Sequence, residues 1–104
     1  MKLDEDIRYI DFHSHRAEGE GHALIIRNLF ADEEVPVSVP SGIYFSAGMH
    51  PWYLTEENGA EMMAALKNTL KHPRVIAVGE AGFDSMRGPS INIQYDAFIF
   101  QAQL

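Results

Sequence analysis

Three short apolar segments of the sequence each run into a polar residue that can take part in chemistry. The first leads into His13 and His15, the second into His50, and the third into Glu80. Short apolar segments of this kind are typical of strands in a parallel sheet, whose carboxyl ends gather at one edge where ligands bind. The pattern predicts an α/β fold that assembles these polar residues at the carboxyl ends of its strands.

The strands and loops are predicted from apolar runs and from the positions of proline and glycine. Strands are expected at 8–12, 24–29, 44–47 and 75–78, and the last, a nearly continuous apolar run, is expected to be buried on both faces. Val35, Val37 and Val39 alternate with other residues and predict an additional edge strand. Pro36 and Pro40 make a helix in that segment unfavourable.

Two helices are predicted in the second half of the chain. The first follows Asn58, which is expected to cap it together with Glu61, three residues later. Ser90 is expected to cap the second, whose apolar side is expected to consist of Ile91, Tyr95, Phe98, Ile99 and Ala102. Trp52 and Tyr53 are expected to pack under the first helix rather than line a pocket.

Composition narrows the class of protein. The chain has 104 residues, which is enough for one domain, and a net charge of -7, which disfavours a module that binds nucleic acid through a basic face. Cysteine is absent, so a metal site must use histidine and carboxylate ligands. The acidic N-terminal segment does not resemble a signal peptide, and no apolar stretch reaches membrane-spanning length, so a cytoplasmic location is expected.

The side chains of Asp11, His13 and His15 fall on one face of the first predicted strand, because a strand alternates with a period of two. Two imidazoles at this spacing can bind one divalent ion. The alternative is a chance pair of histidines on a solvent-exposed strand edge, which has the same sequence pattern. Glu80 directly follows an apolar strand, where a carboxylate is costly to bury unless it is paired or binds a cation. We predict that His13, His15 and Glu80 are metal ligands and that Glu80 is catalytic; the alternative for Glu80 is a solvated carboxylate.

The remaining candidates surround this predicted site. His50 precedes a proline at a strand end and is predicted to contact substrate, with a hydrogen bond to nearby backbone as the alternative. Asp11 is predicted to hydrogen-bond to a ligating imidazole, and Asp84 to support the site near Glu80 in the same way. Gly79 and Gly82 flank Glu80 and permit the close backbone approach that a tight site needs.

Three motifs in this order resemble the TatD-like metal-dependent deoxyribonuclease family: Asp11-Phe12-His13-Ser14-His15, Gly48-Met49-His50-Pro51-Trp52 and Val78-Gly79-Glu80-Ala81-Gly82-Phe83-Asp84. The resemblance implies a TIM-type (β/α) barrel with, usually, two divalent ions such as Mg, Mn or Zn. It implies that His13 and His15 are the first two ligands, that Glu80 is a shared carboxylate ligand, and that His50 lies near the substrate. The family's other ligands lie on later strands, so residues 1–104 are predicted to be one partial domain, the N-terminal half of the barrel with about four strands and two helices.

The resemblance implies a hydrolase of phosphodiester bonds, with DNA or another phosphodiester as substrate, and this chain alone is expected to be inactive. One alternative is a non-catalytic fragment that self-associates through its open sheet edges. Another is a different His-x-His hydrolase acting on C–N or phosphomonoester bonds. The block 79–82 argues against a C–N hydrolase, because many such enzymes place a metal-bridging lysine at that strand and this block contains none.

Overall fold

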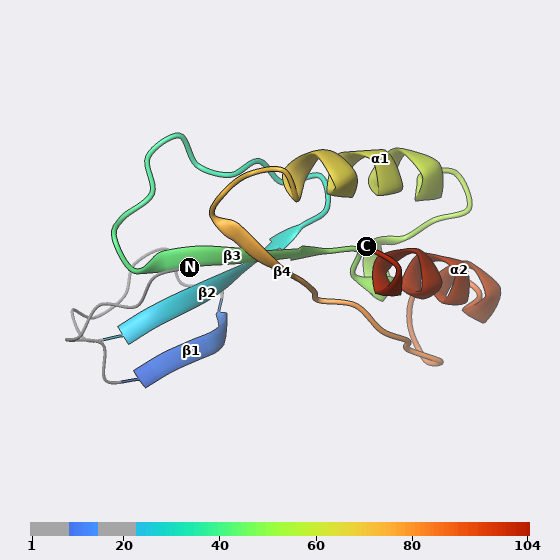
Figure 1. Cartoon of the computed structure of the whole chain (residues 1–104). Helices are drawn as coiled ribbons and strands as arrows, with labels where there is room; N and C mark the ends of the chain where they lie inside the picture. The colour runs from blue at the N-terminus through green and yellow to red at the C-terminus, as the bar shows by residue number, and fades with distance from the viewer. Residues whose placement is uncertain (1–8, 15–22) are drawn as a thin grey trace.

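The computed structural model of the chain describes residues 9–14 and 23–104, with side chains described from Leu24 onward. Within these described ranges the chain forms four strands, a short 3-10 helix and two α-helices (Figure 1). Their bounds are β1 Tyr9–Ser14, β2 Ala23–Phe30, β3 Ile43–Gly48, η1 Pro51–Tyr53, α1 Gly59–Thr69, β4 Val75–Val78 and α2 Ile91–Ala102. The α/β class predicted from the sequence is confirmed.

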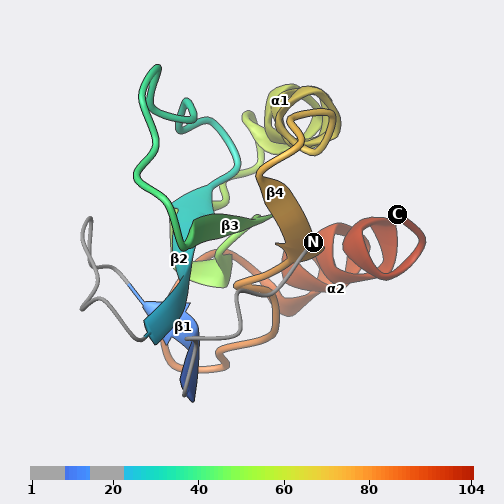
Figure 2. The same cartoon turned by 60° about the vertical axis from the view of Figure 1, so that its left-hand side comes forward.

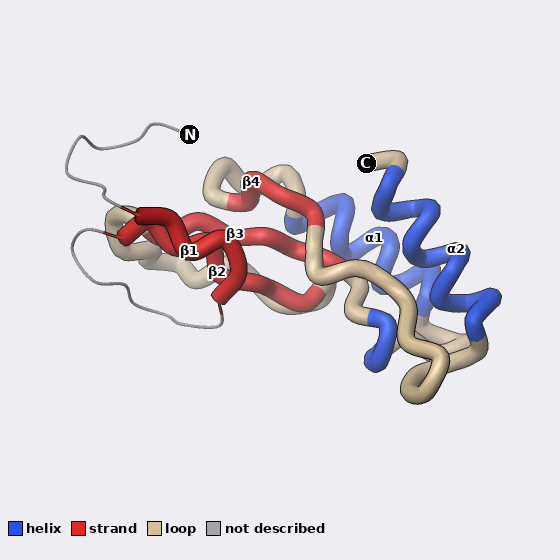
Figure 3. Tube along the Cα trace, turned by 90° about the horizontal axis from the view of Figure 1, so that it is seen from below, coloured by secondary structure: helices blue, strands red, loops and turns tan. Residues whose placement is uncertain are grey.

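All neighbouring strands pair in parallel, in the order β1-β2-β3-β4. Their carboxyl ends therefore lie at one edge of the sheet, as predicted from the polar residues that follow them. In Figure 1, α1 lies above the sheet and α2 lies beyond the carboxyl end of β4. Figure 3 shows the same separation from below, with the strands in one half of the molecule and the helices in the other.

The hydrophobic core lies between one face of the sheet and the two helices, whose relative positions are clearest in Figure 2. Alternate side chains of β2 and β3 point to this face because strand side chains alternate. The core members from these strands are Ile25, Leu29, Ile43, Phe45 and Ala47, with Leu66 from α1 and Ala97 from α2. The core thus fixes the helices against the same strands that lead into the candidate site.

Two strand predictions are wrong. The segment with Val35, Val37 and Val39 forms no strand, and Val37 is fully exposed, because Pro36 and Pro40 remove backbone donors that a ladder needs. β4 is not buried on both faces: it lies at the end of the strand order, and Ile76 and Val78 remain 37% and 39% exposed.

The helix ends also differ from the prediction. Asn58 occupies the N-cap position of α1, but its side chain makes no cap hydrogen bond. Its Oδ1 instead accepts from the backbone N–H of Thr55, at 2.8 Å, and its Nδ2 donates to the carbonyl of Tyr53. The side chain therefore hydrogen-bonds to the turn that precedes the helix instead of capping the helix. Short polar side chains often make such hydrogen bonds to nearby backbone. Ser90 likewise stands at the N-cap of α2 without a side-chain cap hydrogen bond.

The buried face of α2 is not the predicted apolar one. Ile91 and Tyr95 are 48% and 54% exposed, whereas Gln94 and Gln101 are buried beside Ala97. On this face Ala97 joins the hydrophobic core, and the glutamines on either side of it meet loop backbone. Amide side chains can hydrogen-bond to that backbone, and apolar side chains cannot.

Candidate active site at the carboxyl ends of the strands

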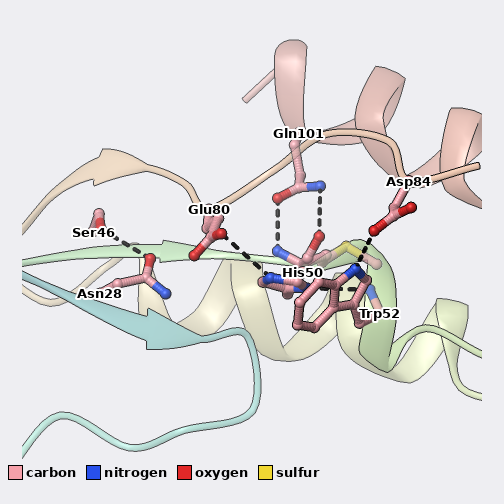
Figure 4. Close-up of polar contacts among 8 residues, drawn as sticks. Asn28, Ser46, His50, Trp52, Glu80, Asp84 and Gln101 are labelled. Carbon is pink, nitrogen blue, oxygen red and sulfur yellow. Dashed lines mark hydrogen bonds and ion pairs between the residues drawn. The ribbon is translucent and has the colours of Figure 1, made fainter. Parts of the chain in front are cut away.

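His50 and Glu80 come from neighbouring strands and meet at the carboxyl edge of the sheet (Figure 4). His50 follows β3 and caps η1, where its Nδ1 accepts from the backbone N–H of Trp52 at 3.1 Å. Because Nδ1 is an acceptor, the proton of the neutral imidazole belongs on Nε2. That Nε2 lies 3.3 Å from Oε1 of Glu80, so His50 donates toward the carboxylate.

The backbone of Gly48 permits the two loops to come this close. A Cβ placed on Gly48 would lie 2.5 Å from the carbonyl carbon of Gly79 and 2.8 Å from the backbone nitrogen of Glu80. Both neighbours are backbone atoms, which cannot move aside as a flexible side chain can. The glycine at this position is therefore required for the close packing of the end of β3 against the start of the Glu80 loop.

The Gly48→Ala substitution is expected to lower the free energy of unfolding by about 1–3 kcal/mol, the usual cost of overpacking. It is also expected to move Glu80 away from His50, since the added methyl group collides with the Glu80 backbone. Urea unfolding measures the first effect and a structure of the variant the second. Gly59→Ala is the matched control, because a Cβ at Gly59 meets nothing within 4 Å. Equal stabilities of the two variants would contradict the steric argument.

Asp84 and Trp52 form a second polar contact beside the first. The indole Nε1–H of Trp52 donates to Oδ2 of Asp84 at 2.6 Å, and the backbone N–H of Met86 donates to Oδ1 at 2.8 Å. The hydrogen bond from Trp52, followed by that from Met86, holds the pKa of Asp84 below its ordinary value of 3.8. The guanidinium of Arg87 lies over the ring of this indole, 4.0 Å from its centroid.

The Trp52→Phe substitution is expected to raise the pKa of Asp84, because it removes the largest interaction that favours the carboxylate. Since the folded-state pKa is the depressed one, the stability that ionised Asp84 contributes is present above the unfolded pKa and is lost as the pH falls through the folded value. A ¹³C NMR titration of the Asp84 carboxyl carbon measures the pKa in both proteins. An unchanged pKa in Trp52→Phe would show that the indole does not stabilise the anion.

Aromatic rings lie close to the imidazole of His50. The centroids of Trp52 and Tyr53 lie 4.9 and 5.1 Å from the imidazole, and Phe30, at the end of β2, lies 5.1 Å from Tyr53. Trp52 and Tyr53 are 38% and 49% exposed, so the prediction that they pack under the helix is wrong. Tyr53, Phe30 and His50 line a hollow of about 370 Å³, which offers apolar ring surface next to the polar pair.

His50 also lines a second, smaller hollow of about 220 Å³. Its walls include His50, Trp52, Glu80 and Asp84, so both hydrogen-bonded pairs reach the same space. The side chain of Glu80 is 40% exposed and that of His50 is 12% exposed. A carboxylate with this exposure at a strand end can accept a cation or a proton from a molecule in the hollow.

The structure describes the predicted metal ligands to different extents: Glu80 completely, His13 without its side chain, and His15 not at all. His13 lies in β1, near its carboxyl end, but its side chain and that of Asp11 are outside the description, and so is all of His15. β2 and β3 separate β1 from β4 in the sheet. Within the described part of the chain, no cluster of three histidine or carboxylate side chains could hold a metal ion. That His13 and His15 share an ion with Glu80 stays a prediction.

Several residues of the site were missed in the sequence. Phe30 directly follows the strand expected at 24–29 and is not among the predicted site residues, and Gln94 and Gln101 have no signal in a scan for apolar periodicity. The sequence does contain one indication for the glutamines, which is their spacing: they are seven residues apart and so lie on one face of a helix.

Comparison with known proteins identifies a family whose model matches the part of the chain that contains these residues. The family model described as TatD related DNase matches residues 31–104, a segment that contains His50, Glu80 and Asp84 and begins after His13 and His15. Two curated relatives carry the name 3'-5' ssDNA/RNA exonuclease TatD. The relative from Erwinia billingiae (strain Eb661) is 37% identical over 65 residues, which cover 62% of this chain and 24% of that protein. The relative from Erwinia tasmaniensis is 35% identical over 65 residues, with the same coverage of both chains.

The aligned part thus spans about a quarter of the length of these relatives. No solved structure matches the chain significantly. Among the helices in the described ranges, none is long and apolar enough to cross a membrane. The family match covers more than half of the chain and includes both members of the His50–Glu80 pair. The chain therefore belongs to the TatD related DNase family.

Proposed function

We propose that this chain is the N-terminal part of a divalent-metal-dependent hydrolase of phosphodiester bonds, with a nucleic acid as substrate. The observation that carries the proposal is the His50–Glu80 pair, which lies at the carboxyl edge of a parallel sheet and faces a hollow. Carboxyl edges of such sheets are where ligands bind in α/β proteins. The names of the two Erwinia relatives support nucleic acid as the substrate class.

The residues present fit a hard divalent ion such as Mg²⁺ or Mn²⁺, or the borderline Zn²⁺. Glu80 provides a partly exposed carboxylate at the hollow, and the chain's cysteine-free composition leaves only oxygen and imidazole donors. His13 and His15 would complete the donor set from the β1 end of the sheet edge. Bound divalent ions supply a nucleophilic water at neutral pH and stabilise charge on the phosphoryl oxygens.

The chain's own side chains hold and orient the reacting groups. The Nε2–H of His50 donates to Glu80 and fixes one of its carboxylate oxygens. The side chain of Glu80 is 40% exposed and lines the smaller hollow. The aromatic rings of Phe30 and Tyr53 line the adjoining hollow and provide surface against which unpaired bases can stack.

The family alignment and the parallel sheet support a partial TIM-type barrel, because a complete barrel has eight strands and roughly 250 residues. Residues 1–104 would then contribute its first strands, and later strands would supply the remaining ligands. We accordingly expect the 104-residue chain alone to bind divalent ions weakly and to lack turnover. The proposed location of the whole protein is the cytoplasm.

The test is hydrolysis of a labelled single-stranded oligonucleotide by the complete protein that contains this chain, with and without Mg²⁺ or Mn²⁺. We expect cleavage that requires the metal. An aminohydrolase substrate serves as the negative control for C–N bond chemistry. Absence of metal-dependent cleavage by the complete protein would reject the proposal. Robust cleavage by residues 1–104 that is abolished by His15→Ala would contradict the expectation that this chain alone lacks turnover.

A second candidate function, self-association of the fragment, is favoured by β4. In the described part of the chain β4 pairs only with β3, and it exposes Ile76 and Val78. An exposed apolar edge strand is a template for pairing with another copy. Sedimentation of the 104-residue chain tests this: a dimer that Ile76→Lys converts to a monomer supports association, and a monomeric parent chain rejects it.

A further inference from the structure

Helix α2 buries two glutamine side chains against loop backbone. Gln94 is 1% exposed and Gln101 is 5% exposed, and they lie seven residues apart on one face of the helix. Burying a primary amide costs free energy unless its donor and acceptor are both paired. In both side chains they are paired, and the partners belong to the two loops that carry the candidate site.

Gln101 holds the loop that follows β3. Its Oε1 accepts from the backbone N–H of Met49 at 2.7 Å, and its Nε2 donates to the carbonyl of the same residue at 3.4 Å (Figure 4). Nε2 also donates to the carbonyl of Ala97 within α2, at 3.1 Å. The amide thus pairs with Met49 as a neighbouring strand would, and Met49 is the residue directly before His50.

Gln94 holds the loop that follows β4 in the same way. Its Oε1 accepts from the backbone N–H of Asp84 at 2.7 Å, and its Nε2 donates to the carbonyl of Asp84 at 3.0 Å. The same Nε2 reaches the carbonyl of Pro89 at 2.9 Å. Asp84 in turn accepts from the indole of Trp52, so this loop is tied back to the η1 helix that His50 caps.

We propose that Gln94 and Gln101 are positioning residues that use α2 as a common support for the two loops and so set the separation between His50 and Glu80. His50 directly follows Met49, whose backbone is bound by Gln101. Glu80 precedes Asp84 in the loop after β4, and the Asp84 backbone is bound by Gln94. Their effect on catalysis rests on the proposed function, whereas the positioning itself does not.

The chemistry of the side chain explains why glutamine is needed at both positions. Each loop residue presents one N–H and one C=O to the helix, and only an amide offers an acceptor and a donor together. Glutamate would keep the acceptor and lose the donor, and methionine, of similar length, would lose both. Substitution by glutamate therefore removes one of the two hydrogen-bonding functions and substitution by methionine removes both, with little change in side-chain length.

The test uses Gln94→Met and Gln101→Met, with Gln103→Met as the matched control on an exposed position of the same chain. Trp52 is the single tryptophan, so its fluorescence in the 104-residue chain reports on the Asp84 contact without substrate or metal. We expect Gln94→Met to shift the Trp52 emission to longer wavelength and to increase quenching by iodide. We expect Gln101→Met to change the ¹⁵N shifts of the His50 ring. Gln103→Met should change neither signal.

In the complete protein we expect kcat to fall about 10–100-fold for Gln94→Met and Gln101→Met, with KM within about twofold, as for other residues that orient ligands through a second contact. If a methionine variant fails to fold, Gln94→Glu and Gln101→Glu replace them, and smaller shifts in the same direction are expected. Folded variants whose Trp52 emission, His50 shifts and kcat all match those of Gln103→Met would overturn the inference. An inactive parent protein would reject the proposed function but leave the two spectroscopic results to decide the positioning.

Discussion

Replacing Glu80 by glutamine is expected to lower the rate of phosphodiester hydrolysis by the complete protein about 10²–10⁴-fold, the range seen when one electrostatic stabiliser is removed. The substitution keeps the size of the side chain and removes its charge, so the proposed metal ligand is lost with little change in packing. It also replaces the charged acceptor that His50 Nε2 contacts at 3.3 Å. Cleavage of a single-stranded oligonucleotide at saturating Mn²⁺ measures the effect.

The stability of the same variant separates chemistry from folding. A partly desolvated carboxylate without its cation is unfavourable, so without metal the melting temperature of Glu80→Gln should be unchanged or slightly raised. Glu57→Gln makes the same chemical change at an exposed position outside the site and should retain the parent rate. If Glu80→Gln keeps most of the parent rate, Glu80 is not a catalytic metal ligand and the predicted ligands reduce to the histidine pair.

The strands and the polar residues at their ends could be predicted because the signals are local. The apolar runs that become β2 and β4, and the positions of His50 and Glu80 directly after strands, depend on neighbouring residues only. The approach of His50 to Glu80 also followed from a general rule, since parallel strands bring their carboxyl ends together. What this rule could not supply was the hydrogen-bonding direction, which depends on the N–H of Trp52 occupying Nδ1.

The errors arose where the outcome depends on a distant partner. The apolar run of β4 has the composition of a strand covered on both faces, yet its exposure is decided by its place at the end of the strand order. Periodicity assigned Tyr95 to the buried side of α2 because it scores hydrophobicity alone. The helix meets the backbone of Met49 and Asp84, and against such a surface Gln94 and Gln101 are the residues that can be buried.

Removing either imidazole of the His13–His15 pair is expected to weaken Mn²⁺ binding by more than about 100-fold, because loss of a residue that merely orients a ligand already costs 10–100-fold. β1 is parallel to β2, so the end of β1 that contains His13 lies at the same sheet edge as Glu80. The family match begins at residue 31 and thus gives no independent support for these two ligands, which makes this measurement decisive for them. Calorimetric titration of His13→Ala and His15→Ala in the complete protein measures the affinity.

The matched control is His72→Asn. His72 lies between α1 and β4, at the opposite end of the strand from Glu80, and its Nδ1 accepts from the backbone N–H of Arg74 at 3.1 Å. Asparagine retains an acceptor for that N–H, so the variant removes an imidazole without unpairing the backbone. We expect its Mn²⁺ affinity and hydrolysis rate to equal those of the parent. If His13→Ala and His15→Ala bind Mn²⁺ as tightly as His72→Asn does, the pair is a chance feature of a strand edge, and the ion must be held by Glu80 together with ligands from later strands.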